Sequence, residues 1–180
     1  MKRKTGTVYT PPRTASHRPP TGKAAASELS SGDVIAGHYV IEERLGDGGM
    51  AVVYRAVNTA TGKPIALKIL RTQLGDRPEF VQLFAKEAKV SSVIGDYDHI
   101  VQVFDAGLDE ERGIPFIVME LLEGETVEDI LQRGPLEVAL IRSLLSQLAG
   151  ALEHAHDAGV VHRDLKPSNL FVTTDRAGDP

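Results

Sequence analysis

A glycine-rich segment at 46–50 lies between two short runs rich in β-branched residues, 39–45 and 51–57. The valines of the second run predict a strand, so the glycines would form the tip of a β-hairpin. A G-x-G-x-x-A string is also found in dinucleotide-binding folds, but there a helix must follow at once and point its N-terminus at the pyrophosphate. The predicted strand argues against that fold. Glycines at a hairpin tip let backbone amides lie over phosphates, although an ordinary flexible hairpin loop is the alternative.

The chain after this hairpin changes from strands to helices. Short apolar runs predict three further strands, at 65–70, 100–104 and 115–120. A helix is predicted between the first two, with a capping pattern at 76–79 and Pro78 in its first turn. Two more are predicted at 127–132 and 136–158, the longer one amphipathic and followed by Gly159 as its C-cap. The pattern therefore predicts an α+β fold with a β-rich part before an α-rich part.

The first 32 residues differ in composition from the rest of the chain. They carry six basic side chains and one acid, a charge of +5, with four of the ten prolines and almost no large apolar residues. Such a segment cannot bury enough surface to offset its ordering entropy, so we predict that residues 1–32 form a disordered basic arm. A solvated tail without a partner is one interpretation. Docking on an anionic surface, or on the remainder of the chain with its charge of −10, is the other.

Composition also excludes several classes of protein. An apolar fraction of 42% can support a core, and the lack of cysteine excludes disulfide scaffolds, thiolate zinc sites and cysteine nucleophiles. The net charge of −5 argues against a general nucleic-acid binder. No run approaches the roughly 18 apolar residues of a membrane-spanning helix, and no secretory signal follows the basic N-terminus. We expect a cytoplasmic protein with no nucleic-acid partner and no membrane segment within this chain.

Lys68 lies in the middle of the apolar run 65–70, whose side chains alternate between two faces. A charge in that place lies either at a solvated edge or beside an anionic partner. The apolar stripe of the next predicted helix includes Phe80 and Phe84, and its next inward position is Glu87. A solvated surface charge would explain either residue alone. Together they favour an ion pair between Lys68 and Glu87, with the lysine reaching on to a phosphate.

Six polar residues and a proline lie between apolar flanks at 160–172, which predicts a short loop between two strand-like pieces. Asp164 and Asn169 are five residues apart, a spacing that suits a carboxylate orienting a nucleophile and an amide oxygen binding Mg²⁺. Lys166 lies between them and can neutralise charge on a transferred phosphoryl group. A polar turn without chemistry seldom contains all of these residues in order.

These motifs resemble those of the eukaryotic-type (Hanks-type) serine/threonine protein kinases, in their bacterial form. They occur in family order: LGDGGMAVVY at 45–54, IALK at 65–68, Glu87 in FAKEA, VMELLEGET at 118–126 and HRDLKPSN at 162–169. The resemblance covers residues 33–180. It implies a bilobal protein-kinase-like fold, with the N-lobe, its one regulatory helix and the hinge at 33–122 and the start of the C-lobe at 123–180. It also implies ATP and Mg²⁺ as cofactors and protein Ser or Thr hydroxyls as acceptors.

The resemblance implies a role for each matching residue. Asp164 would be the catalytic base, Lys166 would contact the transferred phosphate, and Asn169 would bind Mg²⁺. Lys68 would bind the α- and β-phosphates and pair with Glu87. His162 would be a structural anchor of the loop, and Arg163 is typical of kinases controlled by activation-loop phosphorylation. The nucleotide would be covered by Leu45, Gly46, Gly48 and Val53, and its adenine contacted by Ala66, the gatekeeper Met119 and the hinge residues Glu120 and Leu122, with Glu123 near the ribose.

The sequence departs from the family pattern in two places. Ala51 replaces the third glycine of the loop, a change that family members commonly tolerate. No Asp-Phe-Gly sequence occurs in the 180 residues, and the second Mg²⁺-binding aspartate and the activation loop are missing with it. We therefore expect a truncated kinase domain, with a complete N-lobe and an incomplete C-lobe, that is inactive as this fragment. The alternatives are a non-catalytic ATP-binding or pseudokinase fragment, and a small-molecule phosphotransferase of the aminoglycoside-kinase type.

Overall fold

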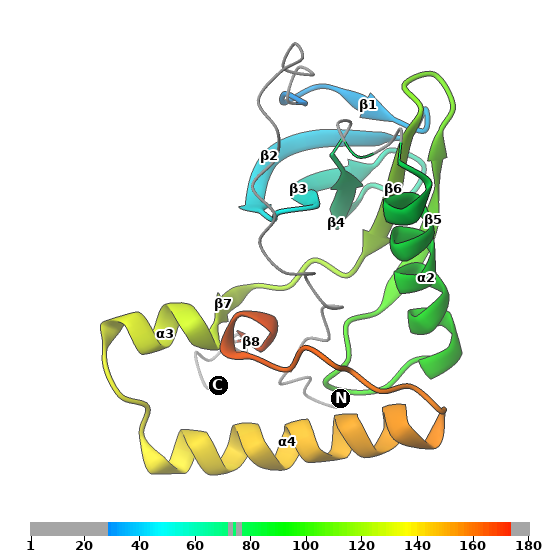
Figure 1. Ribbon diagram of the computed structural model, residues 1–180. Coiled ribbons are helices and arrows are strands. Elements are labelled where there is room, and N and C mark those ends of the chain that lie inside the picture. Colours follow the sequence, from blue (N-terminus) through cyan, green and yellow to red (C-terminus); the bar gives the residue numbers. More distant parts are fainter. Residues whose placement is uncertain (1–28, 72–73, 75–76, 174–180) are drawn as a thin grey trace. The chain divides into compact units, whose positions relative to one another are not determined.

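The computed structural model describes residues 29–71, 74 and 77–173, and these form two compact units (Figure 1). The sheet unit comprises the described residues up to 89 together with 103–121. The helical unit comprises residues 90–102 and the described residues from 122 onward. Helix α2, Pro78–Ile94, contributes to both units and begins at the proline that the sequence placed in its first turn. Most of the predicted basic arm, residues 1–28, and the start of the predicted cap at 76 lie outside the described residues.

The sheet unit is built on a six-stranded sheet with the order β1-β2-β3-β4-β6-β5 (Figure 1). All neighbouring strands are antiparallel. The predicted glycine-tipped hairpin is present as β2 and β3. The strands are β1 Val34–Ile35, β2 Tyr39–Asp47, β3 Ala51–Asn58, β4 Lys63–Leu70, β5 Val103–Asp109 and β6 Ile114–Met119.

Side chains of β4 pack on two different apolar clusters, one on each face of the sheet. Leu67 and Ile69 belong to a cluster drawn from the sheet strands alone. Leu70 belongs to a second cluster that includes Phe84 of α2. Because Lys68 lies two residues before Leu70, its side chain projects on the same side, toward α2.

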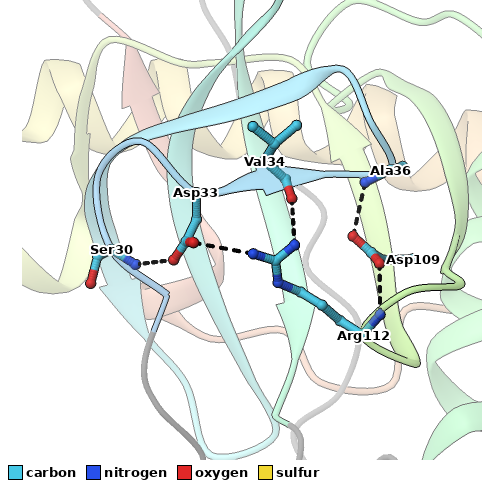
Figure 2. A network of polar contacts seen from close by, with 6 residues as sticks. All are labelled: Ser30, Asp33, Val34, Ala36, Asp109 and Arg112. Atoms are coloured by element: carbon cyan, nitrogen blue, oxygen red, sulfur yellow. Dashed lines mark hydrogen bonds and ion pairs between the residues drawn. The ribbon is translucent and has the colours of Figure 1, made fainter.

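Polar contacts tie the first strand of the sheet to the turn between β5 and β6, at the other end of the strand order (Figure 2). The Asp109 carboxylate accepts hydrogen bonds from the backbone N–H groups of Ala36 at 3.0 Å and Arg112 at 2.9 Å. The Arg112 side chain donates to the carbonyl oxygen of Val34 at 2.8 Å and pairs with Asp33 at 3.1 Å. Asp109 is only 3% exposed. This network secures a strand of two residues that its own ladder could hold only weakly.

Besides the end of α2, the described residues of the helical unit form two α-helices, a short 3-10 helix and a two-stranded sheet (Figure 1). These elements are β7 Gly124–Thr126, α3 Val127–Arg133, α4 Val138–Asp157, η1 Pro167–Asn169 and β8 Phe171–Thr173. A reciprocal capping box between Thr126 and Asp129 begins α3. No helix in the described part of the chain is both long enough and apolar enough to cross a membrane.

Helix α4 ends in a Schellman motif, as the glycine after it predicts. The N–H of Gly159 donates to the carbonyl oxygen of His156, and that of Val160 donates to Ala155, both at 2.8 Å. Gly159 has a φ of 74°, a left-handed conformation that glycine adopts without strain. The predicted end of this helix is confirmed.

The C-terminal end of α2 is capped by a side chain of α4. Nε2 of His154 donates to the carbonyl oxygen of Ile94 at 3.0 Å, one of the final carbonyls that lack an intrahelical donor. The Tyr97 ring stacks on the His154 ring, with centroids 4.2 Å apart and planes inclined by 13°. Because α2 has no basic residue in its own last turn, α4 supplies the donor.

Two strand predictions are wrong. The strand expected at 100–104 is β5, which spans Val103–Asp109. Residues before it are held in a turn, where the N–H of Ile100 donates to Tyr97 at 3.1 Å and His99 has a φ of 72°. The strand-like piece expected at 160–161 does not form, because Val160 is engaged in closing α4. Only the flank after the loop forms a strand, β8.

Candidate active site

Lys68 and Glu87 form the predicted ion pair within the sheet unit. Nζ of Lys68 lies 2.5 Å from Oε1 of Glu87. Their side chains are only 14% and 13% exposed. Burial raises the pKa of Glu87, and the charge and hydrogen bond of Lys68 oppose this shift. Removing one partner of a buried ion pair typically costs about 3–5 kcal/mol.

Several residues predicted to bind the nucleotide lie beside Lys68 on the same face of the sheet. Gly46, Val53 and Lys68 are direct cross-strand neighbours on β2, β3 and β4. Ala66, two residues before Lys68, pairs with Met119 on β6. Cross-strand partners, and residues two apart on one strand, project from the same side of a sheet. The structure therefore places these residues on the face of the sheet from which Lys68 projects.

The remaining predicted nucleotide contacts lie at the hairpin tip and after β6. Leu45 is 48% exposed, and the N–H of Gly48 closes the tip by donating to Ala51 at 2.9 Å. Glu120 directly follows β6 in the sheet unit. Leu122 and Glu123 precede β7 in the helical unit.

Asp164, Lys166 and Asn169 form a connected cluster in the helical unit. Nζ of Lys166 donates to Oδ2 of Asp164 at 2.7 Å. Nδ2 of Asn169 donates to the backbone carbonyl oxygen of Asp164 at 2.7 Å and to its Oδ2 at 3.3 Å. Asn169 is buried, whereas the side chains of Asp164 and Lys166 are 22% and 33% exposed. A buried amide thus fixes a carboxylate and an ammonium that a substrate can still reach.

His162 makes the contacts of a loop anchor. Its Nδ1 accepts the N–H of Asp164 at 3.2 Å, and its carbonyl oxygen accepts the same group at 2.9 Å. Arg163 between them has a φ of 63°, which turns the backbone sharply at this point. Burial lowers the pKa of His162; the negative charge of Asp164 opposes this shift, and the positive charge of Lys166 adds to it.

The lowered pKa of His162 predicts a loss of folding stability in mild acid. The unfolded chain takes up this proton near pH 6.5, the ordinary histidine value, whereas the folded chain does so only at lower pH. The contribution is therefore complete above about pH 6.5 and is lost as the pH falls toward the folded value. We expect His162→Asn, which offers an acceptor near Nδ1 but does not titrate, to reduce the difference in unfolding free energy between pH 7.5 and 5.5. Urea unfolding measures this, with His156→Asn on exposed α4 as the control; equal pH dependence of wild type and His162→Asn would contradict it.

Gly124, which packs against the strand after the loop at 162–169, was not predicted from the sequence to have a role. Gly124 in β7 has a φ of 147°, and a Cβ there would overlap the carbonyl oxygen of Val172 in β8. β7 therefore packs directly against the strand that follows the loop, with Glu125 opposite Val172. Glycine at this position is fixed by a contact between segments almost 50 residues apart, so its local sequence gives no signal.

Comparison with known proteins decides the family. The family model described as the protein kinase domain matches residues 39–177. The chain belongs to the protein kinase family. The relatives that it matches include serine/threonine-protein kinases of bacteria. It is 39% identical over 142 residues to the serine/threonine-protein kinase PrkC of Bacillus subtilis, an alignment that covers 78% of this chain and 22% of PrkC. It is 34% identical over 146 residues to PknA of Mycobacterium tuberculosis, covering 79% of this chain and 34% of PknA.

Solved kinase structures have the same fold. The crystal structure of the Mycobacterium tuberculosis PknI kinase domain superposes with a TM-score of 0.69 at 31% identity, covering 83% of this chain and 59% of that domain. The predicted protein-kinase-like α+β fold is therefore confirmed. The chain spans about a fifth to a third of the length of the two bacterial relatives and somewhat more than half of the PknI domain.

Proposed function

We propose that the protein transfers the γ-phosphoryl group of ATP to Ser or Thr hydroxyls of protein substrates. The observation that carries this proposal is the cluster of Asp164, Lys166 and Asn169, in which a reachable carboxylate and ammonium are fixed by a buried amide. The desolvated pair of Lys68 and Glu87 supports it, because a lysine held in this way is ordered for a phosphate.

Asp164 is proposed to act on the acceptor hydroxyl. Its carboxylate orients the hydroxyl and takes its proton as the oxygen bonds to the γ-phosphorus and the bond from that phosphorus to ADP breaks. The Lys166 ammonium neutralises negative charge on the transferred group. The protein forms no covalent bond to the phosphoryl group during such a transfer. Positioning of the reactants and neutralisation of charge therefore account for most of the rate acceleration.

Asn169 fits the role of a Mg²⁺ ligand. Its Nδ2 is engaged with Asp164, which leaves Oδ1, a hard oxygen of the type Mg²⁺ prefers, for the cation. When bound, Mg²⁺ supplies positive charge to the phosphate oxygens of the nucleotide. A polypeptide of residues 1–180 alone is proposed to be inactive, because its sequence lacks the family's second Mg²⁺-binding aspartate.

The nucleotide is proposed to lie on the Lys68 side of the sheet. Lys68 binds the α- and β-phosphates, and the glycine-rich turn covers them. Small or apolar side chains beside Lys68 suit the flat face of an adenine. The proposed contacts are Leu45, Gly46, Gly48, Val53, Ala66, Met119, Glu120, Leu122 and Glu123.

Lys68→Met is expected to weaken ATP binding by roughly 10- to 100-fold, the usual contribution of a hydrogen bond to a charged group. Binding is measured with a fluorescent ATP analogue and Mg²⁺, on the protein as its gene encodes it. Lys63→Met, at the exposed start of the same strand, is the matched control. Adding Glu87→Gln to Lys68→Met removes the buried carboxylate charge that the lysine no longer balances, so it should recover stability but not ATP affinity. Equal affinity of Lys68→Met and wild type would refute the proposed phosphate contact.

A further inference from the structure

The tip of the β2–β3 hairpin is held by an arginine that the proposed function does not use. Arg71 directly follows β4, and its backbone N–H donates to the carbonyl oxygen of Met50 at 2.9 Å. Its Nε donates to the carbonyl oxygen of Gly48 at 3.1 Å, and its guanidinium also pairs with the carboxylate of Asp47. One residue, directly after β4, therefore contacts the tip at three points.

The second oxygen of the Asp47 carboxylate pairs with Arg44, which lies on the same strand, β2. The Asp47 side chain is 51% exposed, and ion pairs this exposed contribute little to folding stability. The pairing of Asp47 with Arg71 is therefore better explained by its effect on the turn than by its effect on the fold.

The turn needs an external contact because of its composition. Residues 46, 48 and 49 are glycines, which lose more conformational entropy than any other residue when they are ordered. Arg71 lies three residues after Lys68, a span of about 10 Å along a strand. The contacts of Arg71 thus fix the turn with respect to the strand that carries the proposed phosphate-binding lysine.

We propose that Asp47 and Arg71 are positioning residues that hold the glycine-rich turn in place beside Lys68, and so set the affinity of the protein for the phosphate chain of ATP. This inference rests on the proposed function. A turn that is already ordered loses less entropy when it closes on a ligand. Without the pair, the KM for ATP rises about three- to tenfold, the scale of one exposed ion pair and one side-chain hydrogen bond. The kcat changes by less than about twofold, because neither residue acts on the reacting atoms.

Steady-state phosphorylation kinetics of Asp47→Asn, Arg71→Met and the double variant, each made in the protein as its gene encodes it, test the pair. Each single variant should raise the KM for ATP, and the double variant should raise it no further than Arg71→Met does, because Arg71→Met already removes the contact between Asp47 and Arg71. Arg44→Met, which leaves the contacts of Arg71 intact, should change the KM by less than about twofold. Glu42→Gln and Arg55→Met are matched controls, since these two residues form an exposed ion pair, 2.8 Å long, between β2 and β3 and away from the tip. Unchanged KM values in both single variants, multiplied effects in the double variant, or an equal loss of kcat would overturn the proposal.

Hydrogen exchange of the peptide that covers 44–52 tests the same contact without any need for activity. Exchange should be faster in Asp47→Asn and Arg71→Met than in wild type and the Glu42→Gln control, because the tip opens more often. Equal exchange in all four proteins would overturn the proposal. If wild type transfers no phosphate, the proposed function fails, while the exchange result still decides whether the pair holds the turn.

Discussion

Replacing Asp164 by Asn is expected to lower the rate of phosphoryl transfer by about 10²- to 10⁴-fold, the range that a positioned general base contributes. The substitution keeps the shape of the side chain. Its oxygen can still accept from Lys166, so the loop geometry should persist. It removes the group that takes the hydroxyl proton, so kcat should fall while the affinity for ATP stays within about twofold.

The comparison uses initial rates with a generic acceptor protein, for the protein as its gene encodes it. Asp157→Asn, an exposed residue at the end of α4, is the matched control and should retain the wild-type rate. Thermal unfolding of both variants verifies that the fold is kept. A rate for Asp164→Asn within threefold of wild type would show that the carboxylate is not the base.

Replacing Asp109 by Ala is expected to destabilise the protein by about 2–4 kcal/mol. The N–H groups of Ala36 and Arg112, which are partly buried in these contacts, would each lose a charged acceptor, at a typical cost of about 1–3 kcal/mol. The Arg112 side chain would keep its contacts with Val34 and Asp33, so part of the polar network in Figure 2 would remain. Urea unfolding measures the change, with Glu110→Ala in the same exposed turn as the control. A loss below 0.5 kcal/mol would contradict this account.

The contribution of the Asp109 carboxylate to folding stability depends on pH in a direction that can be predicted. Burial alone would raise the pKa of Asp109, but the backbone N–H groups of Ala36 and Arg112 and the charge of Arg112 outweigh it and lower the pKa. The stabilisation is therefore present above the ordinary aspartate value, near pH 3.9, and is lost as the pH falls through the lower folded value. Asp109→Asn should lack this loss, which separates the carboxylate from other groups that titrate in acid.

The sequence predicts those parts of the fold that are determined by interactions between residues close together in the chain. Three such features are found in the structure: the alternation of side chains around Lys68, the proline that begins α2 and the glycine that follows α4. Each depends only on residues within a few positions of it in the sequence. The two-residue strand β1 has no such pattern. It is held by Asp109 and Arg112, which lie more than 70 residues away.

Some contacts of the candidate site could likewise be predicted from the sequence, and others could not. The contact of Lys68 with Glu87 could be predicted because each charge interrupts an apolar pattern. The cluster of Asp164, Lys166 and Asn169 could be predicted from its spacing within one loop. The contacts of Arg71 with the hairpin tip could not, because an arginine after a strand resembles any solvated charge. Its partners become visible only when the register of β3 and β4 is known.

The most direct test of the proposed function is phosphoamino-acid analysis of an acceptor protein after incubation with the protein, Mg²⁺ and ATP labelled in its γ-phosphate. The protein should be expressed as its gene encodes it, beside its Asp164→Asn variant. Our account predicts label on serine or threonine with wild type and at least about 100-fold less with the variant. Label on a small-molecule acceptor instead of protein, or no transfer by a folded wild type that binds ATP, would contradict it.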